Sequence, residues 1–198
     1  MHTAKPRFNH CIVVDLDYTL VSIDTTAKLV EVRCPWKYRL LSLMFSALKP
    51  LMLLMNKMLN RDLYKLMLLR TCFKKCREPV LDDVIETIYR EIEKSGLNNS
   101  LLKILEKADG IKILLTASID DIAKKFSRFS FDLVISSVIE CREEELYSFL
   151  DLYKRKHVIL KHLLKYCNKI FIIEDSPEPQ YKSLERVKVI QVIHRGRR

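Results

Sequence analysis

The stretch Cys11-Ile12-Val13-Val14-Asp15-Leu16-Asp17-Tyr18-Thr19-Leu20 decides the fold of this chain. It begins as a short apolar run, which is typical of a central β-strand covered on both faces. The run ends in two aspartates that are separated by one residue. Side chains two positions apart on an extended backbone point the same way. We therefore expect Asp15 and Asp17 to project together from the end of a buried strand.

Four further apolar runs follow this one along the chain, and helical patterns lie between them. Such alternation predicts an α/β fold with a doubly wound, parallel five-stranded sheet and right-handed crossovers. The four runs cover residues 111–115, 131–135, 170–173 and 187–193.

Local signals suggest where the helices of this sheet begin and end. Ser100 can cap a helix that ends near Gly110, and Ser118 to Asp121 resembles a capping box. Residues 157–167 carry one apolar stripe, and Ser176-Pro177 suggests a cap followed by a first-turn proline.

Residues 21–98 contain no convincing strand. They predict helices instead: an apolar stretch from Leu40 to Leu69, then an acidic amphipathic helix at about 82–94 that stops at Gly96. The predicted division is a catalytic core of residues 1–20 and 99–198 and a helical cap of residues 21–98.

The composition indicates the type of protein and the kind of molecule it binds. The chain has 198 residues, is 48% hydrophobic and 30% charged, and so resembles an ordinary globular protein. Its 3 glycines exclude a Gly-rich nucleotide loop. The net charge of +10 indicates an anionic partner. We expect no nucleic acid, because the basic residues are spread out and not interleaved with aromatics.

The cysteines show no pairing rhythm, so we expect reduced thiols in a cytoplasmic protein. The apolar run Ile12 to Val14 ends at once in Asp15, which excludes a signal peptide there. The six cysteines are Cys11, Cys34, Cys72, Cys76, Cys141 and Cys167.

Reactive side chains follow several of the predicted strands. Thr116 and Ser118 follow the second, the pair Glu174-Asp175 follows the fourth, and Lys156 precedes a helix. The carboxyl ends of parallel strands meet at one edge of a sheet. Carboxylates gathered there with Asp15 and Asp17 repel each other unless a cation joins them, and a hard divalent ion meets that need.

Each residue also has a simpler explanation. Asp17 can stabilise a turn, Ser118 and Ser176 can cap helices, Thr116 can end a strand, and Lys156 can lie in solvent. The coincidence of all of them at one sheet edge favours a functional site.

This order of segments resembles the haloacid dehalogenase (HAD) superfamily, which carries four short motifs. Asp15-Leu16-Asp17-Tyr18-Thr19 resembles the first motif and Leu114-Leu115-Thr116-Ala117-Ser118 the second. Lys156 at the head of a helix resembles the third, and Phe171-Ile172-Ile173-Glu174-Asp175-Ser176 the fourth. Two positions depart from the pattern: Tyr18 stands where the family most often has Gly, and the fourth motif has Glu174-Asp175 without a later second Asp.

The resemblance implies a magnesium-dependent phosphatase. Asp15 would attack phosphorus and form an aspartyl-phosphate, and Asp17 would act as general acid and base. Mg²⁺ would be held by Asp15, Asp175 and the backbone carbonyl of Asp17. Glu174 would support the metal ligands without binding the ion itself.

The phosphoryl oxygens would be bound by Thr116, by backbone N–H groups near Ala117 and by Lys156, for which Lys154 is a competing candidate. A phosphotransferase with the same intermediate is one alternative. A catalytically weak binding or regulatory protein on the same fold is another.

A helical cap directly after the first motif resembles the phosphoserine-phosphatase-like branch. Its apolar residues, such as Leu51, Leu54 and Met58, could admit a lipid tail or rest on a membrane, and basic residues flank them. We favour the alternative that they pack the cap against itself. Lys49 and Pro50 interrupt the run, so we expect no transmembrane span. The expected substrate is thus a small-molecule or lipid-linked phosphate, with peripheral membrane contact as an open alternative.

Overall fold

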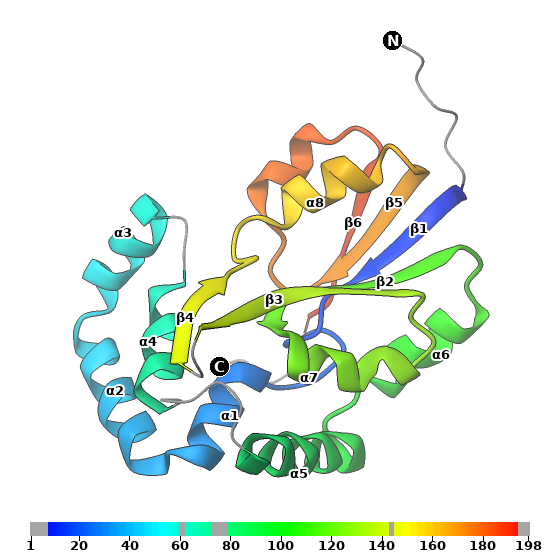
Figure 1. Ribbon diagram of the computed structural model, residues 1–198. Helices are drawn as coiled ribbons and strands as arrows, with labels where there is room; N and C mark the ends of the chain where they lie inside the picture. The colour runs from blue at the N-terminus through cyan, green and yellow to red at the C-terminus, as the bar shows by residue number, and fades with distance from the viewer. Residues whose placement is uncertain (1–7, 60–61, 73–78, 143–144, 194–198) are drawn as a thin grey trace.

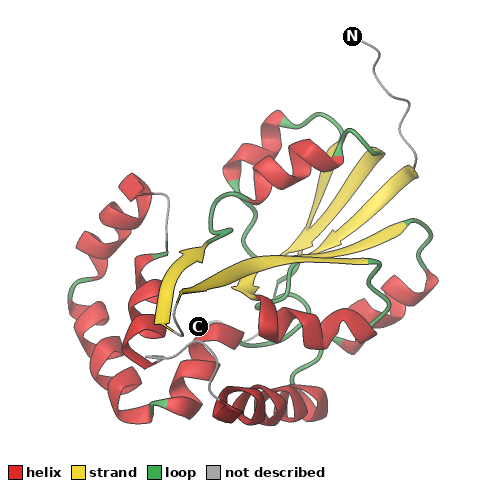
Figure 2. Ribbon diagram, in the orientation of Figure 1, coloured by secondary structure: helices red, strands yellow, loops and turns green. Residues whose placement is uncertain are grey.

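The computed structural model describes residues 8–59, 62–72, 79–142 and 145–193, and its centre is one six-stranded sheet (Figures 1 and 2). The strand order is β4-β3-β2-β1-β5-β6. Five strands are parallel, which confirms the predicted fold class, and β4 is antiparallel to β3 and was not predicted. The strands are β1 (Phe8–Val14), β2 (Ile111–Ile119), β3 (Leu133–Arg142), β4 (Glu145–Leu150), β5 (Cys167–Glu174) and β6 (Val187–Gln191).

Helices cover both faces of the sheet, as Figure 1 shows for α6 and α7 on one face and α8 on the other. Alternate residues of β1 serve the two faces, because successive side chains of a strand point to opposite sides. Ile12 and Val14 join one apolar cluster, while Cys11 and Val13 join the second. Burial on both faces explains why β1 is apolar throughout and why only its end carries acids. The core helices are α6 (Asn99–Lys107), α7 (Asp120–Lys125), η1 (Phe126–Arg128), α8 (Lys156–Leu163) and η2 (Pro179–Ser183).

Among the described residues six helices lie between β1 and β2, and the first five of them fall where the sequence predicted the cap. The chain enters these five helices after Val21 and leaves them before Leu97, and these two residues pair in an isolated bridge. The predicted amphipathic helix is α5, whose buried side includes Ile85, Ile88 and Ile92. The division of the chain into a core and a cap domain, with boundaries after residues 20 and 98, stays a prediction. The helices are α1 (Thr25–Arg33), α2 (Pro35–Ala47), α3 (Lys49–Leu59), α4 (Leu63–Cys72) and α5 (Pro79–Ser95).

Several predicted helix ends are wrong. Asn98, not Ser100, caps α6 and accepts a hydrogen bond from the Leu101 N–H. Ser118 belongs to β2, and α7 begins after it without a side-chain cap. The helix predicted over 157–167 ends at Leu163, and Cys167 already opens β5.

Two further turn predictions were tested. Ser176-Pro177 opens no helix, because the next helical segment is the short η2 and it begins at Pro179. Gly110 lies between α6 and β2 with a φ of 109°. A Cβ there would lie 2.7 Å from the His10 carbonyl oxygen, so the turn requires glycine.

The favoured idea that the apolar residues of α2 and α3 pack the cap against itself is wrong for most of them. Leu41 is the one buried apolar residue of α2, whereas Trp36 and Leu43 are 82% and 71% exposed. Met58 of α3 is 76% exposed. No single helix in the described ranges is long and apolar enough to cross a membrane. α2 and α3 meet that measure only as a pair, bent by 87°.

The expectation of reduced thiols is also wrong for one pair of cysteines. Cys11 on β1 and Cys167 on β5 form a disulfide, with 5.9 Å between their Cα atoms. They lie far apart in the sequence, and only the adjacency of β1 and β5 brings them together. The cysteines therefore no longer support a cytoplasmic location, which stays a prediction.

Candidate active site

A cavity of about 680 Å³ opens at the carboxyl edge of the sheet. Most of the predicted site residues line it, and the cap contributes Asp24, Lys57, Asp62 and Lys65. Parallel strands bring these groups together because each strand ends at the same edge. The predicted residues on its wall are Asp15, Asp17, Ala117, Lys154, Lys156, Glu174 and Asp175.

The floor of the cavity is a buried cluster of two carboxylates and one ammonium group. The Lys156 Nζ lies 2.8 Å from Asp15 Oδ2 and 3.6 Å from Glu174 Oε1. The other Asp15 oxygen accepts a hydrogen bond of 2.8 Å from the Leu16 N–H. Lys156, and not Lys154, is thus the partner of Asp15.

Burial and charge act in opposite directions on this cluster. Burial lowers the pKa of Lys156, but Asp15 and Glu174 outweigh it, and the net pKa is raised. Burial raises the pKa of Glu174 to about 7, although Lys156 opposes the shift. Lys156 therefore stays charged and compensates the carboxylate of Asp15.

Glu178 fixes the helix that carries Lys156. No side chain of the preceding residue caps α8. Instead, the Glu178 carboxylate accepts hydrogen bonds from the Lys156 and His157 N–H groups at 3.2 and 3.3 Å. It also lies 3.0 Å from the His157 ring. A carboxylate at a helix N-terminus is favourable because it meets unpaired N–H groups and the positive end of the helix dipole.

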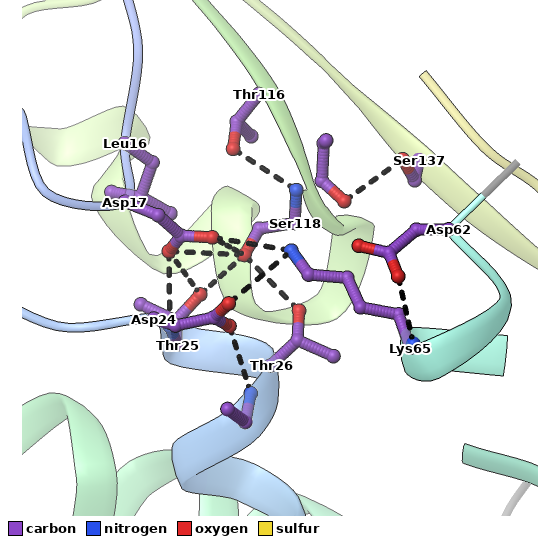
Figure 3. A network of polar contacts seen from close by, with 12 residues as sticks. Leu16, Asp17, Asp24, Thr25, Thr26, Asp62, Lys65, Thr116, Ser118 and Ser137 are labelled. Atoms are coloured by element: carbon purple, nitrogen blue, oxygen red, sulfur yellow. Dashed lines mark hydrogen bonds and ion pairs between the residues drawn. The ribbon is translucent and has the colours of Figure 1, made fainter. Parts of the chain in front are cut away.

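Asp17 is held by residues of both the sheet and the cap (Figure 3). Its Oδ1 accepts hydrogen bonds from the backbone N–H and the hydroxyl of Thr25, at 3.0 and 2.8 Å. The Ser118 hydroxyl donates to Asp17 at 3.1 Å and is also hydrogen-bonded to the Thr25 hydroxyl. Burial raises the pKa of Asp17 to about 6, although Lys65 opposes this. The hydroxyl that was expected to cap a helix is therefore used to orient Asp17.

A second buried lysine comes from the cap. The Lys65 Nζ lies 3.5 Å from Asp17 Oδ2 and 3.8 Å from Asp24 Oδ2 (Figure 3). Burial lowers the pKa of Lys65, but Asp24, Asp17 and Asp62 together raise it above its ordinary value. Lys65 thus connects α4 directly to the end of β1.

The second motif is placed differently from the prediction. Thr116 is fully buried and is not among the cavity-lining residues. Its hydroxyl accepts a hydrogen bond of 3.0 Å from the Ser118 N–H. Ala117 lines the cavity, and its carbonyl accepts a hydrogen bond from the Ser137 hydroxyl. Phosphate binding by Thr116 and Ala117 stays a prediction.

A hydrogen bond from the backbone to a side chain joins the fourth motif to the first. The Thr19 hydroxyl accepts a hydrogen bond of 3.0 Å from the Asp175 N–H. Tyr18 adopts a left-handed φ of 57°, which explains why glycine is favoured at this turn. Tyr18 adopts this conformation although it is not glycine, and Tyr18 also lines the cavity.

The oxygen atoms at this edge fit a magnesium ion. No three Asp, Glu, His or Cys side chains in the described segments are arranged to hold a metal. The candidate ligands are two carboxylates, of Asp15 and Asp175, and the backbone carbonyl of Asp17. Mg²⁺ typically takes one or two carboxylates and fills its remaining positions with water and substrate phosphate. In addition, Glu174 Oε2 is buried without a hydrogen-bond partner, so the pocket holds acceptor capacity that a hydrated cation can use.

Sequence reasoning missed Lys65 and Glu178 as site residues. Lys65 is one of the basic residues that flank the apolar run of the cap, and no local pattern distinguishes it from a solvated lysine. Glu178 acts on a helix 22 residues earlier in the chain. Asp24 could have been found, because it caps α1 through a hydrogen bond to the Ala27 N–H.

The family model of haloacid dehalogenase-like hydrolases matches residues 12–158. The chain therefore belongs to this family of hydrolases, as predicted. No curated protein matches the chain.

Solved structures show the same fold at low sequence identity. A protein of unknown function from Bordetella pertussis Tohama I is 17% identical, with a TM-score of 0.60 over 92% of this chain and 98% of that one. A phosphoserine phosphatase from T. onnurineus is 11% identical, with a TM-score of 0.60 over 96% and 87%. A substrate-bound phosphoserine phosphatase complex is 14% identical, with a TM-score of 0.58 over 85% and 78%. The predicted phosphoserine-phosphatase-like fold is thus confirmed.

Proposed function

We propose that this hydrolase is a magnesium-dependent phosphatase that acts on a phosphate monoester through an aspartyl-phosphate on Asp15. The observation that carries the proposal is the buried pair of Asp15 and Lys156, 2.8 Å apart on the wall of the cavity. A carboxylate held in place beside a fixed cation can attack a phosphoryl group and keep that group's charge balanced.

The residues divide the reaction into two steps. In the first, an Asp15 carboxylate oxygen forms a bond to phosphorus, the bond to the leaving oxygen breaks, and Asp17 gives its proton to that oxygen. In the second, Asp17 takes a proton from water, the water oxygen attacks phosphorus, and the bond to Asp15 breaks. Thr25 and Ser118 hold the Asp17 carboxyl for both transfers.

Magnesium, when bound, supplies positive charge that offsets the repulsion between a carboxylate and a phosphate dianion. Asp15, Asp175 and the Asp17 carbonyl would hold it. Lys156 neutralises charge at Asp15 Oδ2 and lies next to Glu174. Because Glu178 fixes the first turn of α8, the position of this ammonium group is set before substrate arrives.

The substrate is expected to be a phosphorylated small molecule or a lipid-linked phosphate. Four lysines reach the cavity, two from the cap and two from the core, which suits an anionic ligand. They are Lys57, Lys65, Lys154 and Lys156.

A phosphatase screen with and without Mg²⁺ tests the proposal. The wild type is compared with Asp15→Asn, Asp17→Asn and the control Asp109→Asn, an exposed aspartate outside the cavity. Asp15→Asn should reduce kcat/KM at least about a thousand-fold. Asp17→Asn should reduce it by about a hundred-fold or more.

Equal turnover by Asp15→Asn and the wild type would remove Asp15 as the nucleophile. Full turnover by Asp17→Asn would remove only its proton-transfer role. Release of phosphate that depends on an added alcohol acceptor would identify a phosphotransferase. A wild type that binds phosphate esters without turnover would identify a binding protein.

A further inference from the structure

Two consecutive cap helices expose many of their apolar side chains. We call α2 and α3 together the α2–α3 elbow, because they meet at 87° around Leu48. The elbow lies at the outer side of the cap, away from the strands (Figure 1). Along α2, exposed apolar side chains recur at Trp36, Leu40 and Leu43, which is the spacing of one helix face. α3 continues the surface with Leu54 and Met58.

The elbow contributes little to the protein core. α2 buries Leu41 alone among its apolar residues, and none of the described apolar side chains of α3 is buried. The buried residue of α3 is Asn56, whose side-chain oxygen accepts a hydrogen bond from the Leu63 N–H. A helix that buries none of its described apolar side chains has them available for an external partner. Patches of this kind mark interaction sites in soluble proteins.

The charges around the elbow identify the kind of partner. Residues 32–61 contain no Asp or Glu but six basic residues. Arg39 and Lys49 are exposed beside the apolar side chains. Two copies of this chain pairing through the elbow would bring like charges together, which opposes association. An anionic lipid surface offers negative charge at its headgroups and hydrocarbon beneath them.

We propose that the α2–α3 elbow docks on an anionic membrane surface, with its apolar side chains in the interface and its basic residues at the headgroups. Docking does not depend on the proposed phosphatase activity. It does have a consequence for the site. Lys57 of α3 lines the active-site cavity, so a docked elbow would hold that cavity beside the membrane.

Vesicle co-sedimentation with the full-length chain tests this. Vesicles of phosphatidylcholine alone are compared with vesicles containing 30 mol% phosphatidylglycerol (about one lipid in three) at low and high salt. The elbow variant is Leu43→Ser/Met58→Ser. Its matched control is Ile104→Ser/Val158→Ser, at exposed apolar positions of α6 and α8. The charge variant Arg39→Gln/Lys49→Gln is matched by Lys161→Gln/Lys165→Gln on the exposed side of the core.

The wild type should bind the anionic vesicles at low salt, and high salt should weaken binding because exposed charges are screened. The elbow variant should lose roughly ten-fold or more in partitioning, since two large apolar side chains no longer enter the interface. The charge variant should lose binding to anionic vesicles, and both controls should bind like the wild type.

Absence of wild-type binding to anionic vesicles would overturn the proposal, and so would equal binding by the elbow variant and its control. Sedimentation velocity without lipid gives a further check. A dimer that the elbow variant abolishes, with no vesicle binding, would show that the surface pairs two copies of the chain instead.

Discussion

Two buried lysines face the same cavity from opposite sides of the molecule. Lys156 stands on α8 of the core, and Lys65 stands on α4 of the cap. Both are buried, and neighbouring carboxylates raise the pKa of each against the effect of burial. They differ in how closely they are paired. Lys156 lies 2.8 Å from Asp15, whereas Lys65 lies 3.5 Å from Asp17 and 3.8 Å from Asp24.

The difference shows that the site has a fixed half and an assembled half. The Asp15–Lys156 pair depends on β1 and on the start of α8, which the sheet and Glu178 hold in place. The Asp17–Lys65 pair exists only while α4 lies against the end of β1. We therefore expect substitutions of Lys156 to lower both stability and catalytic activity. Substitutions of Lys65 should lower mainly catalytic activity.

The largest effect is expected for Lys156→Met. It leaves Asp15 and Glu174 buried without their cation, which should reduce the free energy of unfolding by on the order of 3 kcal/mol. Activity should fall about a hundred-fold or more, because one fixed charge at the phosphoryl site is lost. Denaturant unfolding and steady-state kinetics measure the two effects. A variant with wild-type stability would contradict the idea of a fixed half.

The core half should contribute to the pH dependence of stability through Glu174. In the metal-free protein, burial raises the pKa of Glu174 from 4.5 to about 7, so the folded state holds this proton more tightly than the unfolded chain does. This contribution is complete below pH 4.5 and is lost as the pH rises through about 7. The free energy of unfolding should fall over that interval by on the order of 2 kcal/mol.

Glu174→Gln tests the assignment, because it removes the titrating group. Unfolding in EDTA between pH 4 and 8 should show a smaller fall in this variant than in the wild type. Parallel curves would assign the pH dependence to other groups, Asp17 first among them.

Lys65→Met should have a smaller effect, concentrated in turnover. Thr25 and Ser118 still hold Asp17 in this variant, so a decrease in kcat of roughly ten-fold is expected. The control is Lys124→Met, which removes an exposed lysine paired with Asp120 on α7. An equal loss in both variants, or a loss for Lys65→Met as large as that for Lys156→Met, would remove the distinction between the two lysines.

Glu178→Gln should have the smallest effect. It keeps one hydrogen-bond acceptor at the start of α8 but removes the negative charge, which should cost roughly 0.5–1 kcal/mol. The Tm should fall by about 1–4 °C in thermal unfolding. Glu185→Gln, an exposed neighbour, should leave the Tm unchanged. A Tm for Glu178→Gln equal to that of this control would show that α8 does not need the Glu178 carboxylate at its N-terminus.

Within the core, the sequence was sufficient where a residue's neighbours along the chain decide its position. The apolar run before Asp15 predicted a strand buried on both faces, and strand–helix alternation predicted the parallel sheet. From these, Asp15, Asp17, Lys156 and Asp175 were expected at one edge, and they line one cavity. The short range of these signals explains this success, because strand ends and helix starts are local features.

Tertiary structure decided what depends on contacts between distant segments. Ser118 has the sequence of a helix cap, but its hydroxyl is bound by Asp17 and Thr25. Cys11 and Cys167 form a disulfide only because β1 and β5 are neighbours. Most of the elbow's described leucines have the pattern of a core and yet are exposed, since an apolar stripe shows which face is apolar and not what covers it. Asp15, Asp17 and Lys156 were thus placed by the sequence, and Lys65 of α4 joined them only because the cap packs against the end of β1.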